Sequence, residues 1–139
     1  MNIVEALKWR YATKKFDPTK AVSKEDIEYL KEAIRLAASS YGLQAYKVLI
    51  ISDQKLKDKL RPVSYNQSQI SDASHLFVFC SYTNIGDEEV DDFMKLNADV
   101  TGKSIKTLEG FSKHLKGDIA GKSPEKMFIW TAKQTYIAL

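Results

Sequence analysis

Three cations near the start of the chain form the first group of residues that could do chemistry. Arg10, Lys14 and Lys15 lie in the run Trp9–Asp17, where a short amphipathic helix is expected to give way to extended chain. Cations beside free backbone amides can bind an anionic small molecule, so this run is a candidate phosphate cradle. The other interpretation is a solvated basic face at a helix end, where Lys and Arg also favour the helix dipole.

Two polar segments further along the chain could contribute to the same site. Ser39-Ser40-Tyr41-Gly42 suits a loop that is rich in accessible backbone groups. Asn66-Gln67-Ser68-Gln69 has the form of a capping box at the start of a helix. Each segment also has a purely structural interpretation, as an ordinary helix end and as an ordinary helix start. Only their combination with the basic cluster suggests a ligand site.

Other kinds of site are disfavoured by residue type and spacing. His75, His114 and the single cysteine, Cys80, do not have the spacing of metal ligands, and we expect no metal site. We expect Cys80 to be a packed, inert thiol. The acidic residues at 87–92 favour the dipole at a helix start. The chain contains neither a P-loop nor a GxGxxG motif after a strand.

Length and charge set the broad class of the protein. The 139 residues suit a single domain over 1–139, and 21 basic against 18 acidic residues give a net charge of +3 without a sustained run of either sign. Dispersed charge argues against nucleic-acid binding. One cysteine fits a reducing compartment, and the sequence shows neither a signal peptide nor an apolar run long enough for a bilayer. We therefore expect a cytoplasmic protein without a membrane partner.

The elements that must position these residues are mainly helices. Two short apolar segments are expected as mostly buried strands, Tyr46–Ser52 and His75–Tyr82. Helices are expected to begin near Asn2, Ser23, Asp53, Asn66, Gly86, Ser104 and Ser123, with Pro62 ending the third and Gly102 the fifth.

The last helix and the small number of strands indicate an unfinished domain. The helix after Ser123 is apolar around most of its circumference and should be buried on several sides. A two-stranded sheet is only marginally stable by itself. We therefore expect that another subunit supplies the missing surface or that the natural protein continues beyond Leu139.

Four motifs in order resemble the FMN-dependent nitroreductases, most closely the branch of oxygen-insensitive NAD(P)H nitroreductases and dihydropteridine reductases. The resemblance covers the whole chain, although these proteins normally continue for roughly one more third of their length. The motifs are Arg10-Tyr11-Ala12-Thr13-Lys14-Lys15-Phe16-Asp17, Ser39-Ser40-Tyr41-Gly42-Leu43-Gln44, Asn66-Gln67-Ser68-Gln69-Ile70-Ser71-Asp72-Ala73-Ser74-His75 and Trp130-Thr131-Ala132-Lys133-Gln134-Thr135-Tyr136.

The resemblance implies an α+β fold with a central, mainly antiparallel sheet surrounded by helices, in an intertwined homodimer with FMN at the interface. It places Arg10 at the FMN phosphate and Lys14 near flavin N1 and O2, as the catalytic cation. The further cofactor-binding residues that it implies are Tyr11, Ala12 through its backbone, Ser39 and Ser40 toward the partner's flavin, Asn66 at the pyrimidine edge, and Gln69. It implies a substrate pocket bordered by Tyr41, Tyr65 and Phe111.

The activity implied by the resemblance is hydride transfer from NAD(P)H through flavin N5 to a nitroaromatic, quinone or pterin. Several positions depart from the usual pattern of the family. Ala12 stands where serine is common, Ala38 and Ala45 where proline is usual, and Gln69 where some relatives carry lysine. The alternative function is a flavin-free packing or binding module that keeps the scaffold without redox activity.

Overall fold

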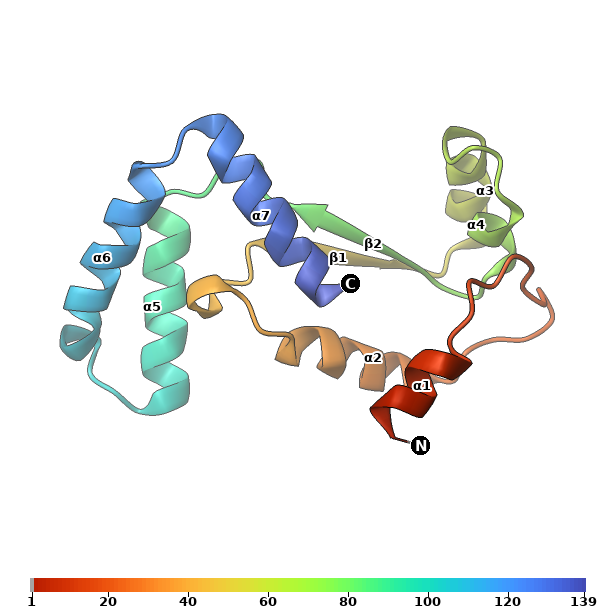
Figure 1. The fold of residues 1–139 in the computed structure, drawn as a ribbon, viewed down its shortest axis with the longest axis horizontal. Coiled ribbons are helices and arrows are strands. Elements are labelled where there is room, and N and C mark those ends of the chain that lie inside the picture. The colour runs from red at the N-terminus through yellow and green to blue at the C-terminus, as the bar shows by residue number, and fades with distance from the viewer. Residues whose placement is uncertain (1) are drawn as a thin grey trace. The chain divides into compact units, whose positions relative to one another are not determined.

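The computed structural model describes residues 2–139 and divides them between two compact units. The first unit runs to Lys24 and resumes over Ile50–Phe77, and the second comprises Glu25–Leu49 and Val78–Leu139. Each unit is described by itself below. The elements in chain order, labelled in Figure 1, are α1 (Ile3–Trp9), α2 (Lys24–Leu36), η1 (Ser40–Gly42), β1 (Tyr46–Ile51), α3 (Gln54–Val63), α4 (Ser68–Asp72), β2 (Leu76–Ser81), α5 (Asp87–Thr101), η2 (Ile105–Leu108), α6 (Glu109–Ala120) and α7 (Pro124–Ala138).

Two helix starts in the first unit form as predicted, whereas one predicted helix end and one predicted cap do not. Asn2 and Glu5 form the expected capping box of α1, and the Asp53 carboxylate accepts from the Leu56 amide at 2.7 Å to begin α3. The prediction that Pro62 ends α3 is wrong, because the helix continues through it to Val63. The capping role of Asn66 is also wrong, since α4 begins after Gln67, which makes no side-chain cap.

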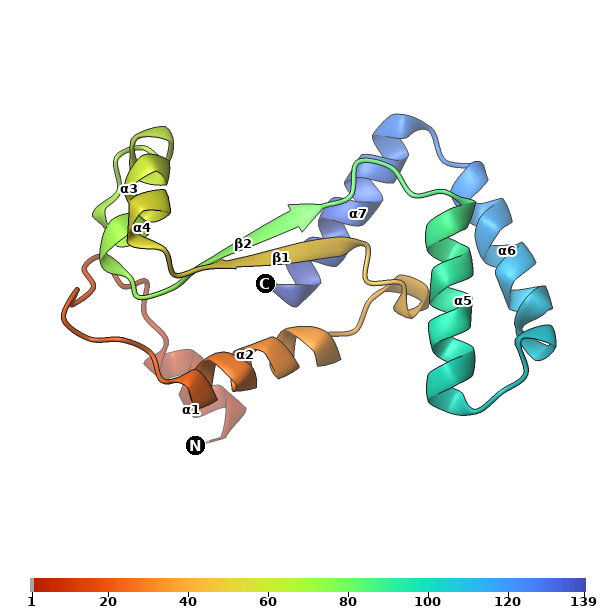
Figure 2. The same cartoon turned by 180° about the vertical axis from the view of Figure 1, so that it is seen from behind.

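The strands β1 and β2 are hydrogen-bonded neighbours in a two-stranded sheet (Figure 2). The Tyr82 amide, just after β2, donates to the carbonyl of Ala45, just before β1, at 3.3 Å. This pairing of the end of one strand with the start of the other is antiparallel. The expectation of mostly buried strands is wrong for the described residues, since no residue of either strand is fully buried and Leu49 is 51% exposed.

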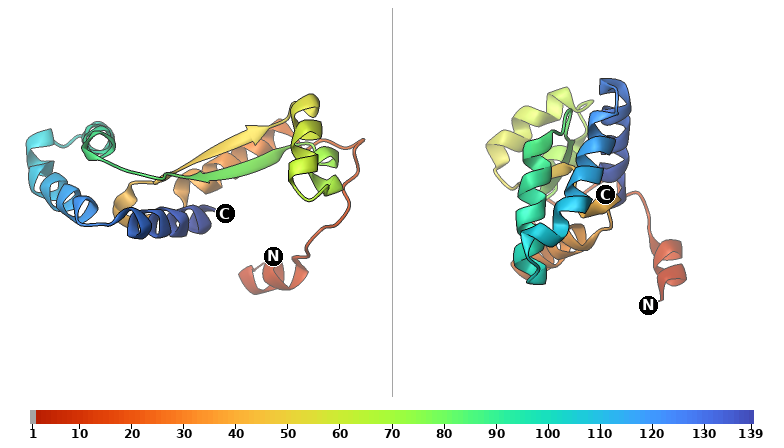
Figure 3. Two further views of the ribbon diagram at one scale, coloured as in Figure 1. Left: turned by 90° about the horizontal axis from the view of Figure 1, so that it is seen from above. Right: turned by 90° about the vertical axis from the view of Figure 1, so that its left-hand side faces the viewer.

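In the second unit, α5 and α6 form a helical pair that is seen side by side in every view (Figures 1 and 3). Gly86 precedes α5, and Gly102 closes it with a left-handed φ of 68°, as the sequence predicted. The helix expected directly after Ser104 is instead a 3-10 turn, η2, followed by α6. The short turn lets the chain reverse before α6 runs back along α5.

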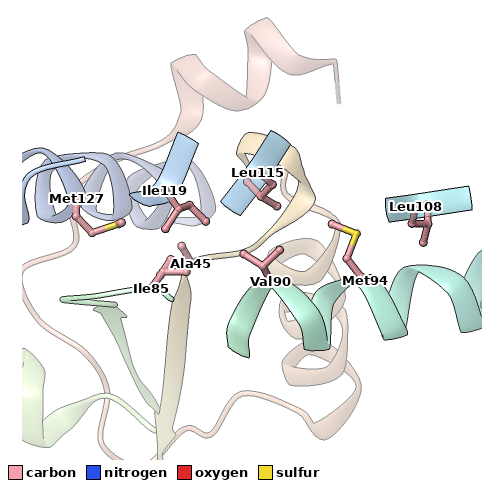
Figure 4. Close-up of a cluster of buried hydrophobic side chains, with 8 residues drawn as sticks. All are labelled: Ala45, Ile85, Val90, Met94, Leu108, Leu115, Ile119 and Met127. Atoms are coloured by element: carbon pink, nitrogen blue, oxygen red, sulfur yellow. The ribbon is translucent and has the colours of Figure 1, made fainter. Parts of the chain in front are cut away.

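The hydrophobic core of the second unit lies where these helices meet the start of β1 and the start of α7 (Figure 4). Val90 and Leu115, from α5 and α6, are completely inaccessible to solvent. Burial of apolar surface contributes roughly 25 cal/mol per Å², so this cluster stabilises the pair of helices and holds α7 against them. Its members are Ala45, Ile85, Val90, Met94, Leu108, Leu115, Ile119 and Met127.

One face of α7 packs inside the second unit and the other does not. Thr131, which is 0% exposed, donates to the carbonyl of Tyr82 at 2.6 Å, and Thr135 pairs with Ser81 at 2.8 Å. The described chain buries only one face of α7, so the predicted burial on several sides would need the further surface that the sequence analysis expects from a second subunit or a longer chain. Tyr136 is 77% exposed and Ile137 55%, because no described segment covers that face.

Residues 2–139 contain neither a membrane-spanning helix nor a cluster of metal ligands. Among residues 2–139, no helix is both long enough and apolar enough to cross a membrane. The same residues include no group of three or more His, Cys, Asp or Glu side chains placed to hold a metal ion.

Candidate functional site

The basic segment leaves α1 as extended, exposed chain, as predicted. Arg10 is the C-cap residue of α1, and its amide donates to the carbonyl of Ala6 at 3.0 Å. Lys14 and Lys15 lie several residues beyond the helix end, and helix dipole effects fade within the last turn. A favourable helix dipole therefore does not account for these two lysines.

The charges of this segment are not neutralised within the described chain. Arg10, Lys14 and Lys15 are all exposed, and none of them takes part in an ion pair among residues 2–139. Tyr11 and Ala12 are exposed in the same segment. Three cations and the free amides of extended chain can bind a phosphate group through charge-assisted hydrogen bonds.

The serine loop is held in an unusual backbone conformation by side chains of the second unit. Tyr41 and Gln44 have positive φ values of 61° and 47°, and Gly42 has 77°. The Ser40 amide donates to Oε1 of the buried Gln134 at 2.7 Å, and the Gln44 amide donates to Ser39 Oγ at 3.0 Å. Residues held in the left-handed region persist only when their surroundings fix them, and such residues cluster at functional sites.

Two of the three expected pocket residues lie together in the second unit. The rings of Tyr41 and Phe111 have centroids 6.2 Å apart, and the Tyr41 ring is also 6.2 Å from that of His114. The Tyr41 hydroxyl donates to Asp118 Oδ2 at 3.2 Å. The Lys122 ammonium, and then the Tyr41 hydroxyl, hold the pKa of the Asp118 carboxyl below its usual value. Tyr41 is therefore anchored at its hydroxyl, and its neighbour Ser40 is anchored at its amide.

Asn66 lies in the turn between α3 and α4 of the first unit. Tyr65 and Asn66 both have φ of 53°, and Tyr65 is 95% exposed. Asn66 Oδ1 accepts from Arg61 Nε at 3.0 Å. Gln69 is half-buried on α4. The carboxamide of Asn66 is thus exposed but fixed at its oxygen.

The expected site residues divide between the two compact units. The structure brings Tyr65 and Asn66 into one turn, and Ser39, Ser40 and Tyr41 into one loop that contacts Phe111. Those of the first unit are Arg10, Tyr11, Ala12, Lys14, Tyr65, Asn66 and Gln69, and those of the second are Ser39, Ser40, Tyr41 and Phe111.

Two supporting residues were not anticipated from the sequence. Gln134 is 5% exposed on α7, and a buried amide usually has a hydrogen-bonding role. That signal was available in the sequence. Arg61 gave no signal, because its contact with Asn66 depends on the shape of the turn after α3.

The sequence model described as "Nitroreductase family" matches residues 7–139, which is nearly the whole chain. The chain belongs to the nitroreductase family. A provisionally named NAD(P)H nitroreductase of Staphylococcus aureus (strain USA300) is 34% identical over 142 residues, covering 99% of this chain and 64% of that protein. The similarly named YfkO of Bacillus subtilis (strain 168) is 34% identical over 152 residues, covering 99% of this chain and 66% of its own length.

Solved structures show the same nitroreductase fold. A provisionally named nitroreductase, ydfN of Bacillus subtilis, superposes with a TM-score of 0.85 at 15% identity, covering 97% of this chain and 65% of that chain. A nitroreductase from Exiguobacterium sibiricum, also provisionally named and crystallised in complex with FMN, superposes with a TM-score of 0.80 at 18% identity, covering 99% and 66%. The present chain thus spans about two thirds of the length of these relatives.

Proposed function

We propose that this chain carries an FMN site of an NAD(P)H-dependent oxidoreductase. The observation that carries the proposal is the match to the nitroreductase family over residues 7–139, which includes the exposed cations of the basic segment. Arg10 would hold the FMN phosphate, and Lys14 would be the cation toward N1 and O2 of the flavin. Tyr11 and Ala12 line the site from the same segment.

The residues present are chemically suited to FMN. A phosphate dianion needs cations that are not already paired, and Arg10, Lys14 and Lys15 form no ion pair among the described residues. A flavin ring needs fixed donors at its pyrimidine edge, and the exposed amide of Asn66 is one. Gln69 contributes a second amide from α4. Ser39 and Ser40 belong to the site of a partner subunit in a homodimer.

FMN would supply the redox chemistry of this site, which is hydride transfer through flavin N5 from NAD(P)H to an acceptor. The cation of Lys14 stabilises negative charge on the N1 and O2 side of the ring, which favours the reduced form. Tyr41 and Phe111, whose ring centroids are 6.2 Å apart, border an aromatic pocket for the acceptor. Tyr65 is the third acceptor-binding residue that the family resemblance implies. That pocket suits a nitroaromatic, a quinone or a pterin. We place the reaction in the cytoplasm.

The proposal is tested by titrating the purified chain with FMN and following the quenching of flavin fluorescence. Replacing Arg10 with Gln should weaken FMN binding about tenfold to a hundredfold, because a charge-assisted hydrogen bond contributes roughly 1.5–3 kcal/mol. Lys8→Gln is the matched control, since Lys8 is an exposed cation two residues earlier and is not part of the proposed site. Equal affinity in Arg10→Gln and wild type would refute the role of Arg10.

A further inference from the structure

Arg61 makes several hydrogen bonds to the turn between α3 and α4. The carbonyl of Arg61 accepts from the amides of Ser64 at 3.0 Å and Asn66 at 3.1 Å. Its guanidinium donates from Nε to Asn66 Oδ1 at 3.0 Å and from a terminal nitrogen to Ser71 Oγ at 3.3 Å. Both the main chain and the side chain of Asn66 are therefore held by the same residue.

These contacts decide which end of the Asn66 carboxamide is free. A guanidinium has only N–H donors, so the amide atom that faces it must be the oxygen. The NH2 group of Asn66 then points away from Arg61, on a side chain that is exposed. Asparagine tolerates the left-handed φ of 53° better than most residues, which lets the turn present it without a large backbone cost.

The positive charge of Arg61 also strengthens the Asn66 NH2 group as a hydrogen-bond donor. Arg61 is half-buried and forms no ion pair with any carboxylate among residues 2–139. The nearby Asp72 carboxylate instead accepts from Ser71 Oγ at 3.1 Å. A cation on the amide oxygen polarises the whole carboxamide, and hydrogen bonds in a chain strengthen one another. The NH2 group of Asn66 is therefore a stronger donor than that of a free asparagine.

We propose that Arg61 is a positioning residue for the ligand of Asn66. It fixes the carboxamide so that the ligand meets N–H donors, and the ligand atom there is an acceptor such as a ring carbonyl oxygen. The identification of that ligand as FMN rests on the function proposed above, because the pyrimidine edge of a flavin carries such acceptors. The orientation of Asn66 stands independently of that function.

The first arm of the test is NMR on the chain without FMN, first as wild type and then with Arg61 substituted. In ¹⁵N NMR spectra, Arg61 Nε–H should exchange with water at least about fivefold more slowly than Arg10 Nε–H, because only Arg61 has a fixed acceptor. Arg61→Met should move the chemical shifts of the two Asn66 NH2 protons to those of an exposed asparagine, and Arg61→Lys should reverse part of that change. Equal exchange at Arg61 and Arg10, or unchanged Asn66 signals in Arg61→Met, would overturn the proposal.

The second arm is a double-mutant cycle on FMN affinity, with Arg61→Met, Asn66→Ala and the pair together. Arg61→Met alone should weaken FMN binding about twofold to tenfold, and it should have no further effect once Asn66 is alanine. Lys59→Met, an exposed lysine on the same helix, should leave the affinity unchanged. Additive losses in the double variant would contradict action through Asn66. A wild-type chain that binds no FMN would refute the proposed function, while the NMR arm would still decide the role of Arg61.

Discussion

Replacing Gln134 with Leu should release the serine loop without disturbing the rest of α7. Gln134 is 5% exposed, and its Oε1 is the acceptor for the Ser40 amide at 2.7 Å. Leucine has a similar volume but no acceptor, so the variant leaves the partly buried Ser40 N–H without a partner. An unsatisfied donor costs roughly 1–3 kcal/mol, and partial access of water to Ser40 places the expected loss at about 1–2 kcal/mol.

The assay for this prediction is hydrogen exchange at individual amides, followed by NMR. The Ser40 amide should exchange about fivefold to thirtyfold faster in Gln134→Leu, which corresponds to the expected loss. Amides of α5 and α6 should keep their protection, since the core around Val90 and Leu115 does not include Gln134. Lys133→Leu, an exposed neighbour on α7, is the control and should leave Ser40 protected.

Two results would refute the reasoning. Unchanged exchange at Ser40 in Gln134→Leu would mean that the glutamine does not hold the loop. Faster exchange throughout α5, α6 and α7 would mean that the substitution damages the core rather than one hydrogen bond. The left-handed backbone at Tyr41 and Gln44 makes the first result unexpected, because such a loop needs outside support.

Three further substitutions test other parts of the structure. Leu115→Ala should lower the free energy of unfolding by about 3–4 kcal/mol, because Leu115 is completely buried; urea unfolding checks this, and a loss below about 1 kcal/mol would contradict the packing. Asp118→Asn should make the stability of the chain less sensitive to acid. The ion pair with Lys122 lowers the pKa of Asp118 in the folded state. This ion pair therefore stabilises the fold above about pH 4, and its contribution is lost as the pH falls through the lowered pKa of the folded state. Urea unfolding at pH 7 and pH 3 should therefore differ more for wild type than for the variant, and equal differences would refute this. Lys14→Met should leave measurable FMN binding but slow flavin reduction by NAD(P)H in stopped flow; an unchanged rate would exclude Lys14 as the cation at N1 and O2.

Much of the fold was predictable because it is encoded by local signals. The capping box of Asn2 and Glu5, the cap of Asp53 and the left-handed Gly102 each act within a few residues, and the structure confirms all three. The start of α7 at Ser123-Pro124 is confirmed for the same reason, since Ser123 Oγ accepts from the Lys126 amide at 3.4 Å.

The errors came from features that depend on distant contacts. Asn66 has the sequence of a helix cap, but Arg61 takes its side chain into another hydrogen bond. Burial of β1 and β2 was inferred from apolar composition, whereas burial depends on which segments cover each face. The composition of a segment indicates how much apolar surface must be buried, but it does not indicate which other segment buries it.

The candidate site was predictable only as a set of residues, through the resemblance of four motifs. The sequence indicated that the basic segment leaves its helix as extended chain, and the structure confirms this. It did not indicate the supporting contacts of Gln134 and Arg61, because an amide or a guanidinium can find its partner at any sequence separation. The roles of Arg10 and Lys14 remain predictions.

The visible absorption spectrum of the purified protein, with its intact mass confirmed, tests the central claim most directly. The proposed function predicts the bands of oxidised flavin, or their appearance after FMN is added and the excess removed, and bleaching of those bands by NADH or NADPH without oxygen. A colourless protein that takes up no added FMN would contradict the claim and would favour a flavin-free packing or binding module.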